Sequence, residues 1–512
     1  MLWLLVAMAF AQSDCIVPAD VRSGRPTLSG EVETVDSDDG LFRLHFTRQG
    51  EDAPGGDEGE DGLPVMVGRI FDGLQFGDLA FQERGYQSFY LDEGAEGSDA
   101  IDVYITQLDS NGYANAVTRS DGETSCYIRI DPDLGSMGGK IVQSVAIHEL
   151  HHCVQFGYTD NSHAFMYEAT ATYEQYLALM DESLELALNV LYIRRLAEPG
   201  QKLNSKQGRY HYAGFLFMKF WSEYGGFDAG RVPALWEQLS QTPQWEEALW
   251  AASQRLWGLP FDKIFLEYAR YNAFACSRDD GQHYLADSLA CSADVQVPYE
   301  ALPGPAGSVA VLLENTRYSA SYARWQSATK GKLSQLSCSA PDDPDGKLRV
   351  LLAQLDSEER LLDYDTMVVK EGKVLRLPMP NSQQGSMLAV FASVGAGPVS
   401  STCTLSESEP VVQQCGCAQG GKHSDREITR DDLPSFGDLL DGVPYLPRLI
   451  TKARAKLRGE LDPDLMYCCG GDRKFLREHG DIHPADFLRV VWAAGNDDDR
   501  VLQFVRESEG RS

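Results

Sequence analysis

The spacing of hydrophobic residues changes along the chain and indicates where strands and helices lie. Residues 101–108 and 125–132 alternate between apolar and polar side chains, a pattern typical of half-buried strands. After residue 140 the apolar residues recur every three or four positions, which predicts helices. The predicted helices cover residues 140–157, 163–180, 182–198, 210–224, 232–241, 246–256 and 260–273. Strands followed by helices predict an α+β domain over residues 63–300.

A different pattern follows this domain. Residues 305–405 contain short β-rich runs separated by Gly, Pro, Asp and Ser, which predicts a β-sandwich. Residues 429–512 return to helical spacing and predict a small all-α domain, which residues 406–428 join to the sandwich as a linker. Upstream, residues 13–62 end in the run GEDAPGGDEGEDG, whose composition predicts a linker or a disordered loop.

The first residues, Met1 to Ala11, are almost wholly apolar and end in an Ala-x-Ala sequence. A membrane-spanning helix needs about 20 apolar residues, so this run is too short to be one. It fits the apolar region of a signal peptide over residues 1–12, and a buried N-terminal strand is the alternative. No later stretch is long and apolar enough for a membrane helix. We therefore expect a secreted or cell-surface protein without an integral membrane segment after signal cleavage.

The charge of the chain narrows the range of its partners. With 45 Lys and Arg against 76 Asp and Glu, the formal net charge is -31 at pH 7. A protein this acidic is repelled by nucleic acids and by anionic membranes. We therefore expect neither of them as a partner.

The chain contains 11 cysteines, and export to an oxidising compartment would permit disulfides. The expected pairs are Cys276–Cys291, Cys338–Cys403 and, as a further alternative, Cys15–Cys126. Cys153 is expected to be a buried free thiol. A second zinc site is considered at Cys415, Cys417, Cys468, Cys469 and His423. The CxC and CC spacings suit tetrahedral zinc poorly, so we expect disulfides there instead.

A metal-binding pattern lies in the first of the predicted helices. His148, Glu149 and His152 form an HExxH motif, and positions i and i+4 lie on one face of a helix. Both imidazoles can therefore reach one zinc ion. Zinc lowers the pKa of a bound water to about 7, and Glu149 can take the proton as the water attacks a carbonyl. The apolar run from Ile141 to Ile147 predicts a buried helix, where such polar residues are costly without a role.

A catalytic zinc takes three protein ligands, so a third is expected downstream. Position 158 is Tyr, which excludes the HExxHxxGxxH form with its third histidine. Glu168 lies in the next predicted helix among small residues that allow close approach to the first helix, and we expect it to be the third ligand. His163, at the start of that helix, is interpreted as a surface residue. Glu174 is expected to accept an N–H from a ligand histidine; the alternative is that both glutamates are solvent-facing charges.

Hydrolysis also needs a donor for the charge that develops on the attacked carbonyl oxygen. The segment GRYHYAG offers Tyr210, His211 and Tyr212, of which the two tyrosines are our candidates; ordinary aromatic packing is the alternative. The strand over residues 125–132 precedes the motif helix and is expected to be the edge strand to which a substrate peptide adds. His151 is interpreted as a packing residue or as a support for the ligands.

Three segments together resemble a known family. The sequences HELHHCVQFGY, YEATATYEQY and RYHYAGFLFMKFW resemble a group of secreted bacterial metalloproteases with HExxHxxQFGY, W-x-x-EAxATW-x-E and a Tyr-rich helix. The resemblance covers residues 63–300 and implies a zincin-like fold of the gluzincin type. It also implies His148, His152 and Glu168 as zinc ligands and Glu149 as the base. Tyr173 stands where that family usually has Trp.

The C-terminal segment carries a second resemblance. The run LPRLITKARAKLRGEL, followed by MYCC and by HPADFLRVVWAAGNDDDRVLQFV, is similar to a small helical bacterial domain of unknown function. This resemblance implies no activity, and the partner of the domain is unknown.

Together these observations predict a secreted zinc metalloendopeptidase with one catalytic Zn²⁺ that hydrolyses proteins or peptides. The alternative is a non-catalytic surface or adhesion protein whose degenerate peptidase domain only holds a metal. A third possibility is that the C-terminal helical domain carries the main role by binding a partner.

Overall fold

The computed structural model divides the chain into two compact units. The first comprises Met1–Glu198, Leu203–Ile264 and His283–Gln296; the second comprises Pro199–Lys202, Phe265–Gln282 and Val297–Ser512. The structure describes residues 16–17, 24–179, 194–279, 281, 283–284, 297–302, 307–313, 317–326, 333–370, 374–378, 386–408, 418–419, 428–462 and 464–509. The expected signal peptide and most of the expected helix over 182–198 lie outside the described residues.

A six-stranded mixed sheet lies in the first unit, in the order β1-β5-β6-β4-β3-β2. Its strands are β1 (Ile16–Val17), β2 (Val32–Asp36), β3 (Phe42–Thr47), β4 (Ile101–Ile105), β5 (Gly112–Thr118) and β6 (Thr124–Ile130). β3, β4 and β6 are parallel, whereas β5 runs antiparallel to β6. The two strands predicted from alternation are therefore present as β4 and β6.

The strand β6, expected to be the edge strand, lies inside the sheet, and on this side β5 and then β1 follow it. β6 is hydrogen-bonded on both sides, to β4 and to β5, so it has no free edge for a substrate peptide. The outer side of β5 pairs in parallel with β1, with Ile16 opposite Ala114 and Val17 opposite Asn115. Alternation does not reveal β5, because its sequence GYANAVT contains few large apolar residues.

The sheet extends upstream of the boundary expected at residue 63, because β2 and β3 belong to it. The acidic segment Gly50–Gly62, expected to be a linker or a disordered loop, also contacts this part of the fold. The buried carboxylate of Asp52 accepts hydrogen bonds from the backbone N–H groups of Ser29 and Gln107, at 2.7 and 2.8 Å. These contacts hold the segment in place despite its polar composition.

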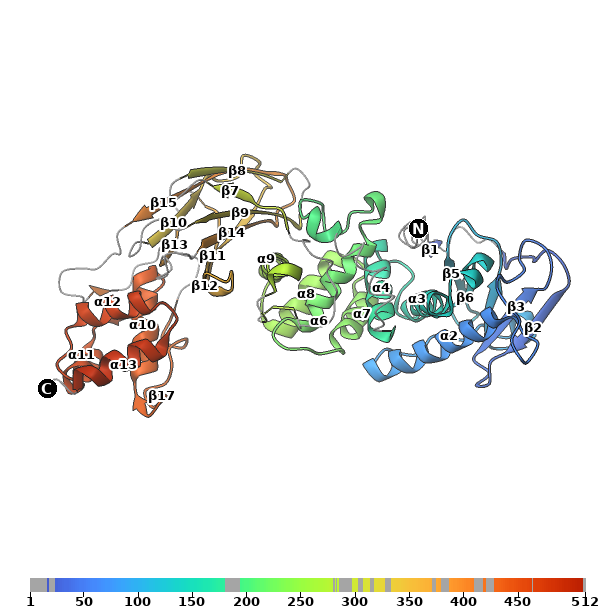
Figure 1. Ribbon diagram of the computed structural model, residues 1–512, viewed down its shortest axis with the longest axis horizontal. Helices are drawn as coiled ribbons and strands as arrows, with labels where there is room; N and C mark the ends of the chain where they lie inside the picture. The colour runs from blue at the N-terminus through green and yellow to red at the C-terminus, as the bar shows by residue number, and fades with distance from the viewer. Residues whose placement is uncertain are drawn as a thin grey trace. The chain divides into compact units, whose positions relative to one another are not determined.

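The motif helix α3 is enclosed by other elements of the first unit. The helices over residues 65–273 are α2 (Val65–Arg84), α3 (Gly139–Tyr158), α4 (Ala164–Leu179), α6 (Phe215–Glu223), α7 (Arg231–Gln241), α8 (Trp245–Trp257) and α9 (Phe261–Ala273). The residues of α9 from Phe265 onward belong to the second unit. α3 packs against α2 and against the strands β5 and β6 (Figure 1). A Cβ on Gly73 of α2 would lie 2.7 Å from the carbonyl oxygen of Gln143 in α3, so the close approach of the two helices requires glycine there.

The second unit contains two sheets, ordered β13-β10-β15-β8 and β12-β11-β14-β9-β7. Their strands are β7 (Glu300–Leu302), β8 (Gly307–Leu313), β9 (Ser319–Gln326), β10 (Leu333–Cys338), β11 (Leu348–Leu355), β12 (Leu361–Val368), β13 (Val374–Pro378), β14 (Ser386–Ser393) and β15 (Val399–Ser408). Leu336 and Leu405 of the first sheet share a hydrophobic core with Val350 and Phe391 of the second. The two sheets therefore pack face to face as a sandwich.

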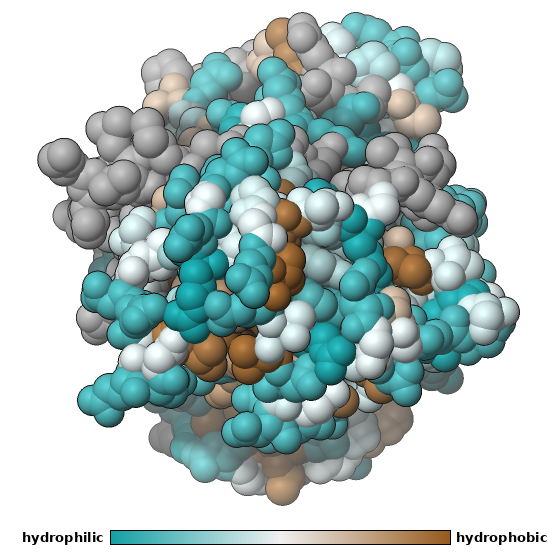
Figure 2. Space-filling model, turned by 90° about the vertical axis from the view of Figure 1, so that its right-hand side faces the viewer, coloured by the Kyte–Doolittle hydropathy of each residue, from teal (hydrophilic) through white to brown (hydrophobic). Residues whose placement is uncertain are grey.

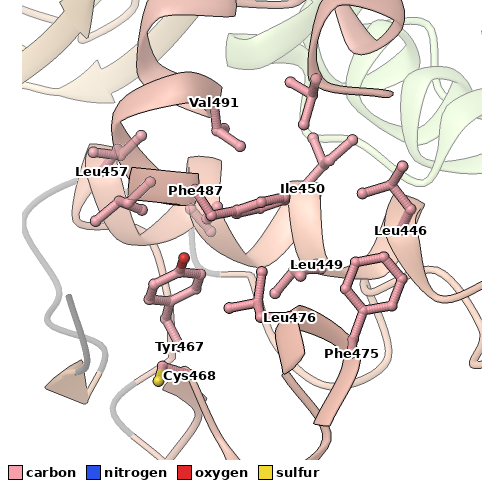
Figure 3. Packing of buried hydrophobic residues seen from close by; sticks show 14 of the residues in the cluster. Leu446, Leu449, Ile450, Leu457, Tyr467, Cys468, Phe475, Leu476, Phe487 and Val491 are labelled. Atoms are coloured by element: carbon pink, nitrogen blue, oxygen red, sulfur yellow. The ribbon is translucent and has the colours of Figure 1, made fainter. Parts of the chain in front are cut away.

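The C-terminal part of the second unit is helical. Its elements are β16 (Ala418–Gln419), β17 (Leu439–Leu440), β18 (Val443–Pro444), α10 (Leu446–Arg458), β19 (Met466–Tyr467), α11 (Gly470–Glu478), α12 (Pro484–Ala494) and α13 (Asp498–Glu509). Leu449 and Ile450 of α10 share a buried core with Leu476 of α11 and Phe487 of α12 (Figure 3). The chain thus combines helices with mixed sheets and ends in a small helical region, as the sequence predicts.

Two disulfides have both of their cysteines among the described residues. The predicted pair Cys338–Cys403 is confirmed and joins β10 to β15. Cys126 pairs with Cys153, so the predictions of a Cys15–Cys126 pair and of a free thiol at Cys153 are wrong. Packing of β6 against α3 buries these two cysteines side by side, which their spacing in sequence does not reveal. Four residues of the other cysteine predictions lie outside the described residues: Cys291, Cys415, Cys417 and His423.

Hydrophilic side chains predominate on the face shown in Figure 2, where apolar side chains form small separate patches. This distribution agrees with the acidic composition of the chain. Among the helices in the described part of the chain, none combines the length and the hydrophobicity that a membrane crossing requires.

Candidate metal centre

The three predicted zinc ligands lie together in the first unit. His148 and His152 are one turn apart on α3, and Glu168 lies on α4. One ligand atom from each residue can be chosen so that all three lie within 4.8 Å of one another. The Nε2 atoms of His148 and His152 are 3.2 and 3.8 Å from Oε2 of Glu168. Two imidazole nitrogens and one carboxylate oxygen are a ligand set that catalytic zinc commonly takes.

Small side chains on α4 lie in a closely packed part of the first unit. Ala169 and Ala171, which flank Glu168 at short range, are completely buried. On another side of α4, a Cβ added to Gly214 would lie 2.8 Å from the Cβ of Ala169. Ala169 therefore allows close packing of α4 against the segment that carries Gly214.

The buried polar atoms at this point fit a cation. Among the described residues, Nε2 of His152 and Oε1 of Glu168 have no hydrogen-bond partner although both are buried. Leaving such an atom unpaired costs about 1–3 kcal/mol, and more for a charged group. A divalent cation between the two histidines and Glu168 would satisfy these atoms. The residues present therefore fit zinc.

Glu149 lies on the same helix and points toward β5. It accepts a hydrogen bond from the backbone N–H of Ala114, and its Oε2 has no hydrogen-bond partner among the described residues. Burial raises the pKa of Glu149 to about 8; the charge of His148 opposes this rise and the charge of Glu168 adds to it. A carboxyl group in this state can exchange a proton near neutral pH, as a general base must.

Two glutamines that the sequence analysis did not single out contact the two candidate ligand histidines. Nδ1 of His152 is 2.7 Å from Oε1 of Gln155, and Nδ1 of His148 is 3.1 Å from Oε1 of Gln175. Both glutamines are buried. The sequence held one signal for them. Gln155 lies three residues after His152 on α3, and Gln175 lies seven residues after Glu168 on α4.

Glu174 makes contacts other than the one expected for it. Its carboxylate lies 2.6 Å from Nε of Arg84 and accepts a hydrogen bond from the hydroxyl of Tyr86 at 2.9 Å. These contacts join α4 to the end of α2. The expected contacts with the ligand histidines are made instead by Gln155 and Gln175.

Two further histidines that the sequence analysis considered, His151 and His163, have other surroundings. His151 is completely buried against the rings of Phe81 and Tyr86, and burial lowers its pKa well below the usual value. It is therefore a neutral, buried residue. Its Nδ1 lies 2.8 Å from Nε2 of Gln155, so it also contacts the glutamine that faces His152. His163 is half-buried, and its Nδ1 accepts a hydrogen bond from the backbone N–H of Phe165 at 3.0 Å, at the start of α4.

The two candidate tyrosines lie in different places. The ring of Tyr212 is nearly parallel to that of His148, with ring centres 6.1 Å apart, and the residue is half-buried. The hydroxyl of Tyr210 donates to the carbonyl oxygen of Glu198 at 2.7 Å, and Tyr210 is completely buried. Tyr212 is therefore the candidate that lies against His148, one of the candidate ligands.

Comparison with known protein families concerns the other end of the chain. Residues 430–512 match the model of a domain of unknown function, DUF5069. This segment contains α10 to α13, and the match confirms the expected small C-terminal domain of unknown function. The candidate metal centre lies outside the matched segment. A search of curated proteins finds no match to the chain.

Proposed function

We propose that the first unit is a zinc-dependent metallopeptidase, secreted from the cell that makes it. The observation that carries this proposal is the approach of His148, His152 and Glu168 to one point, with Glu149 beside them on the motif helix. The disulfides Cys126–Cys153 and Cys338–Cys403 support export, because disulfides persist in oxidising compartments.

The proposed reaction assigns one task to each residue. His148 and His152 would hold the zinc through Nε2, and Glu168 through its carboxylate. Bound zinc would supply a Lewis acid that polarises the substrate carbonyl and acidifies a water molecule. Glu149 takes a proton from the water that attacks the carbonyl carbon. It then delivers this proton to the nitrogen of the leaving amine as the C–N bond breaks.

The strand β5 supports a peptide as the substrate. Gly112 and Ala114 of β5 lie directly beside Glu149. The outer side of β5 accepts an extended backbone, since β1 pairs with it at Ala114 and Asn115. A substrate peptide could add to the same side by backbone hydrogen bonds, in the place of β1.

Hydrolysis of fluorescently labelled casein by the purified full chain tests the proposed function. We expect cleavage that stops when a zinc chelator is added and returns when zinc is restored. Cleavage that persists at full rate after the metal has been removed would contradict the proposal. If the chain cleaves none of a panel of denatured proteins and peptides, either before or after zinc loading, the result would favour a domain that only holds a metal.

Tyr212 is the proposed donor to the carbonyl oxygen of the substrate. We expect Tyr212→Phe to lower kcat by about 10²–10³-fold, as the loss of one such donor does in other hydrolases. Bound zinc should not change, because Tyr212 is not a proposed ligand. Tyr210→Phe is the matched control, since that hydroxyl is already bonded to the carbonyl of Glu198. A larger loss of kcat in Tyr210→Phe than in Tyr212→Phe would exclude this assignment.

Gly112 provides a test of the position of Glu149. A Cβ at Gly112 would lie 2.8 Å from both Cγ and Oε1 of Glu149, so Gly112→Ala must displace this carboxylate. A misplacement of about 1 Å can reduce the rate by about 10²-fold, and we expect a loss of this size in kcat/KM. The control is Gly68→Ala, at an exposed position of α2 where an added Cβ meets no atom within 4 Å. Full activity of Gly112→Ala would show that Glu149 is not the base.

A further inference from the structure

We infer that Gln155 and Gln175 are positioning residues that hold His152 and His148 in the tautomer able to bind a metal, and that they do so as neutral amides. The inference concerns the metal centre of the proposed function and rests on it. Neither glutamine touches the proposed site of the metal; each acts through the Nδ1 atom of a histidine.

The orientation of the Gln155 amide is fixed by its surroundings. Its Nε2 lies 2.9 Å from the backbone carbonyl oxygen of Tyr167 and 2.7 Å from Oγ1 of Thr170. A carbonyl oxygen only accepts hydrogen bonds, so the NH₂ group of Gln155 must face it. The Oε1 atom must then face Nδ1 of His152, 2.7 Å away.

This orientation decides where the proton of His152 lies. An amide oxygen only accepts, so Nδ1 of His152 must carry the hydrogen. The neutral ring then has its lone pair on Nε2, the atom 3.8 Å from Oε2 of Glu168. Gln155 therefore presents His152 to the centre in the form that a metal requires.

Gln175 does the same for His148. Its Oε1 lies 3.1 Å from Nδ1 of His148, and its Nε2 donates to the hydroxyl of Ser144. Nε2 of His148 then faces Oε2 of Glu168 at 3.2 Å. Gln175 and Ser144 are both buried, so water does not compete for these bonds.

The neutrality of the two amides has a consequence of its own. Metal-binding histidines often donate their second N–H to a carboxylate, which raises the basicity of the ring and strengthens metal binding. Here each outer acceptor is an uncharged oxygen, so the two rings are weaker donors than they would be beside carboxylates. The centre therefore keeps more of the positive charge of a bound cation, at a cost in affinity.

The competing explanation is that these glutamines only hold helices together. Gln155 does connect α3 to α4 through Tyr167 and Thr170. A purely structural role predicts a lower melting temperature and an unchanged affinity for zinc. The positioning role predicts a change in affinity that the conservative variant reverses.

The test is a zinc titration of the metal-free full chain in competition with a chromophoric chelator. We expect Gln155→Met and Gln175→Met to bind zinc about 10–100-fold more weakly, the usual effect of removing such an outer partner. Gln175→Glu should bind at least as tightly as wild type, because the Ser144 hydroxyl can turn and donate to the new carboxylate. Gln354→Met, at a buried glutamine of β11, is the matched control and should not change the affinity.

Each outcome decides between the claims. If wild type binds zinc and both Gln175 variants bind it equally well, the inference is wrong and the proposed function stands. If Gln175→Glu binds as weakly as Gln175→Met, the positioning role is also excluded. If wild type binds no zinc, the proposed function fails and the inference fails with it. The Gln175 variants keep the test decisive should Gln155→Met not fold, and melting of the metal-free proteins monitors folding.

Discussion

Glu149→Gln is expected to reduce hydrolysis of labelled casein by about 10²–10⁴-fold, the usual contribution of general acid–base catalysis. The amide keeps the size of the carboxyl group but cannot take a proton from the attacking water. Glu149 is not among the three converging ligands, so the zinc content should equal that of wild type. The measurement is kcat/KM together with the zinc bound per chain.

The control for this variant is Glu237→Gln, the same change at an exposed position of α7, which should behave as wild type. An active Glu149→Gln protein would remove Glu149 from the mechanism. A variant that loses its zinc as well as its activity would mean that Glu149 supports the metal rather than the proton transfer.

Glu168→Gln is expected to lose zinc and activity together. The change removes the one carboxylate among the three converging ligands, and with it the negative charge that faces both histidines. We expect the affinity for zinc to fall by more than the 10–100-fold effect of an outer partner.

Thermal unfolding measures this loss independently of activity. A ligand at about 1,000 times its Kd stabilises the folded state by about 4 kcal/mol, so zinc should raise the Tm of wild type clearly. The same zinc concentration should leave the Tm of Glu168→Gln nearly unchanged. Equal stabilisation of both proteins would show that zinc binds elsewhere in the chain.

The spacing of the motif allowed the sequence to predict part of this centre. An α-helix turns by about 100° per residue, so His148 and His152 necessarily share a face of α3. Glu168 followed from the small residues after it, which the close packing of α4 requires. The β4 and β6 strands and the C-terminal helices followed from periodicity, because regular burial leaves a regular pattern.

The same rotation explains why Glu174 does not make the contact that was predicted for it. Six residues beyond Glu168 correspond to about 600°, which leaves Glu174 about 240° around the helix from the ligand. Seven residues correspond to about 700°, which returns Gln175 to the face of Glu168. The spacing of nearly two turns from Glu168 suggested a role near the metal, but the carboxylate of Glu174 pairs with Arg84 of α2. The pairing could not be predicted, since it depends on how α2 packs.

Contacts between distant segments account for the other differences. Cys126 and Cys153 meet because β6 packs against α3, and no local pattern in either segment signals this pairing. Asp52 orders an acidic segment through backbone N–H groups from two separate loops. The part of β5 beside Glu149 has small residues, because a larger side chain at Gly112 would collide with the carboxylate of Glu149. The close approach that the site requires therefore weakens the strand pattern that would have revealed β5.

X-ray absorption at the zinc edge of the purified, zinc-loaded full chain tests the central claim most directly. The account predicts one tightly bound zinc with two imidazole nitrogens at about 2.0–2.1 Å and carboxylate or water oxygens at about 2.0–2.2 Å, without sulfur. His152→Ala should remove this signal. A chain that binds no zinc, or a zinc surrounded by sulfur at about 2.3 Å, would contradict the assignment of the metal to His148, His152 and Glu168.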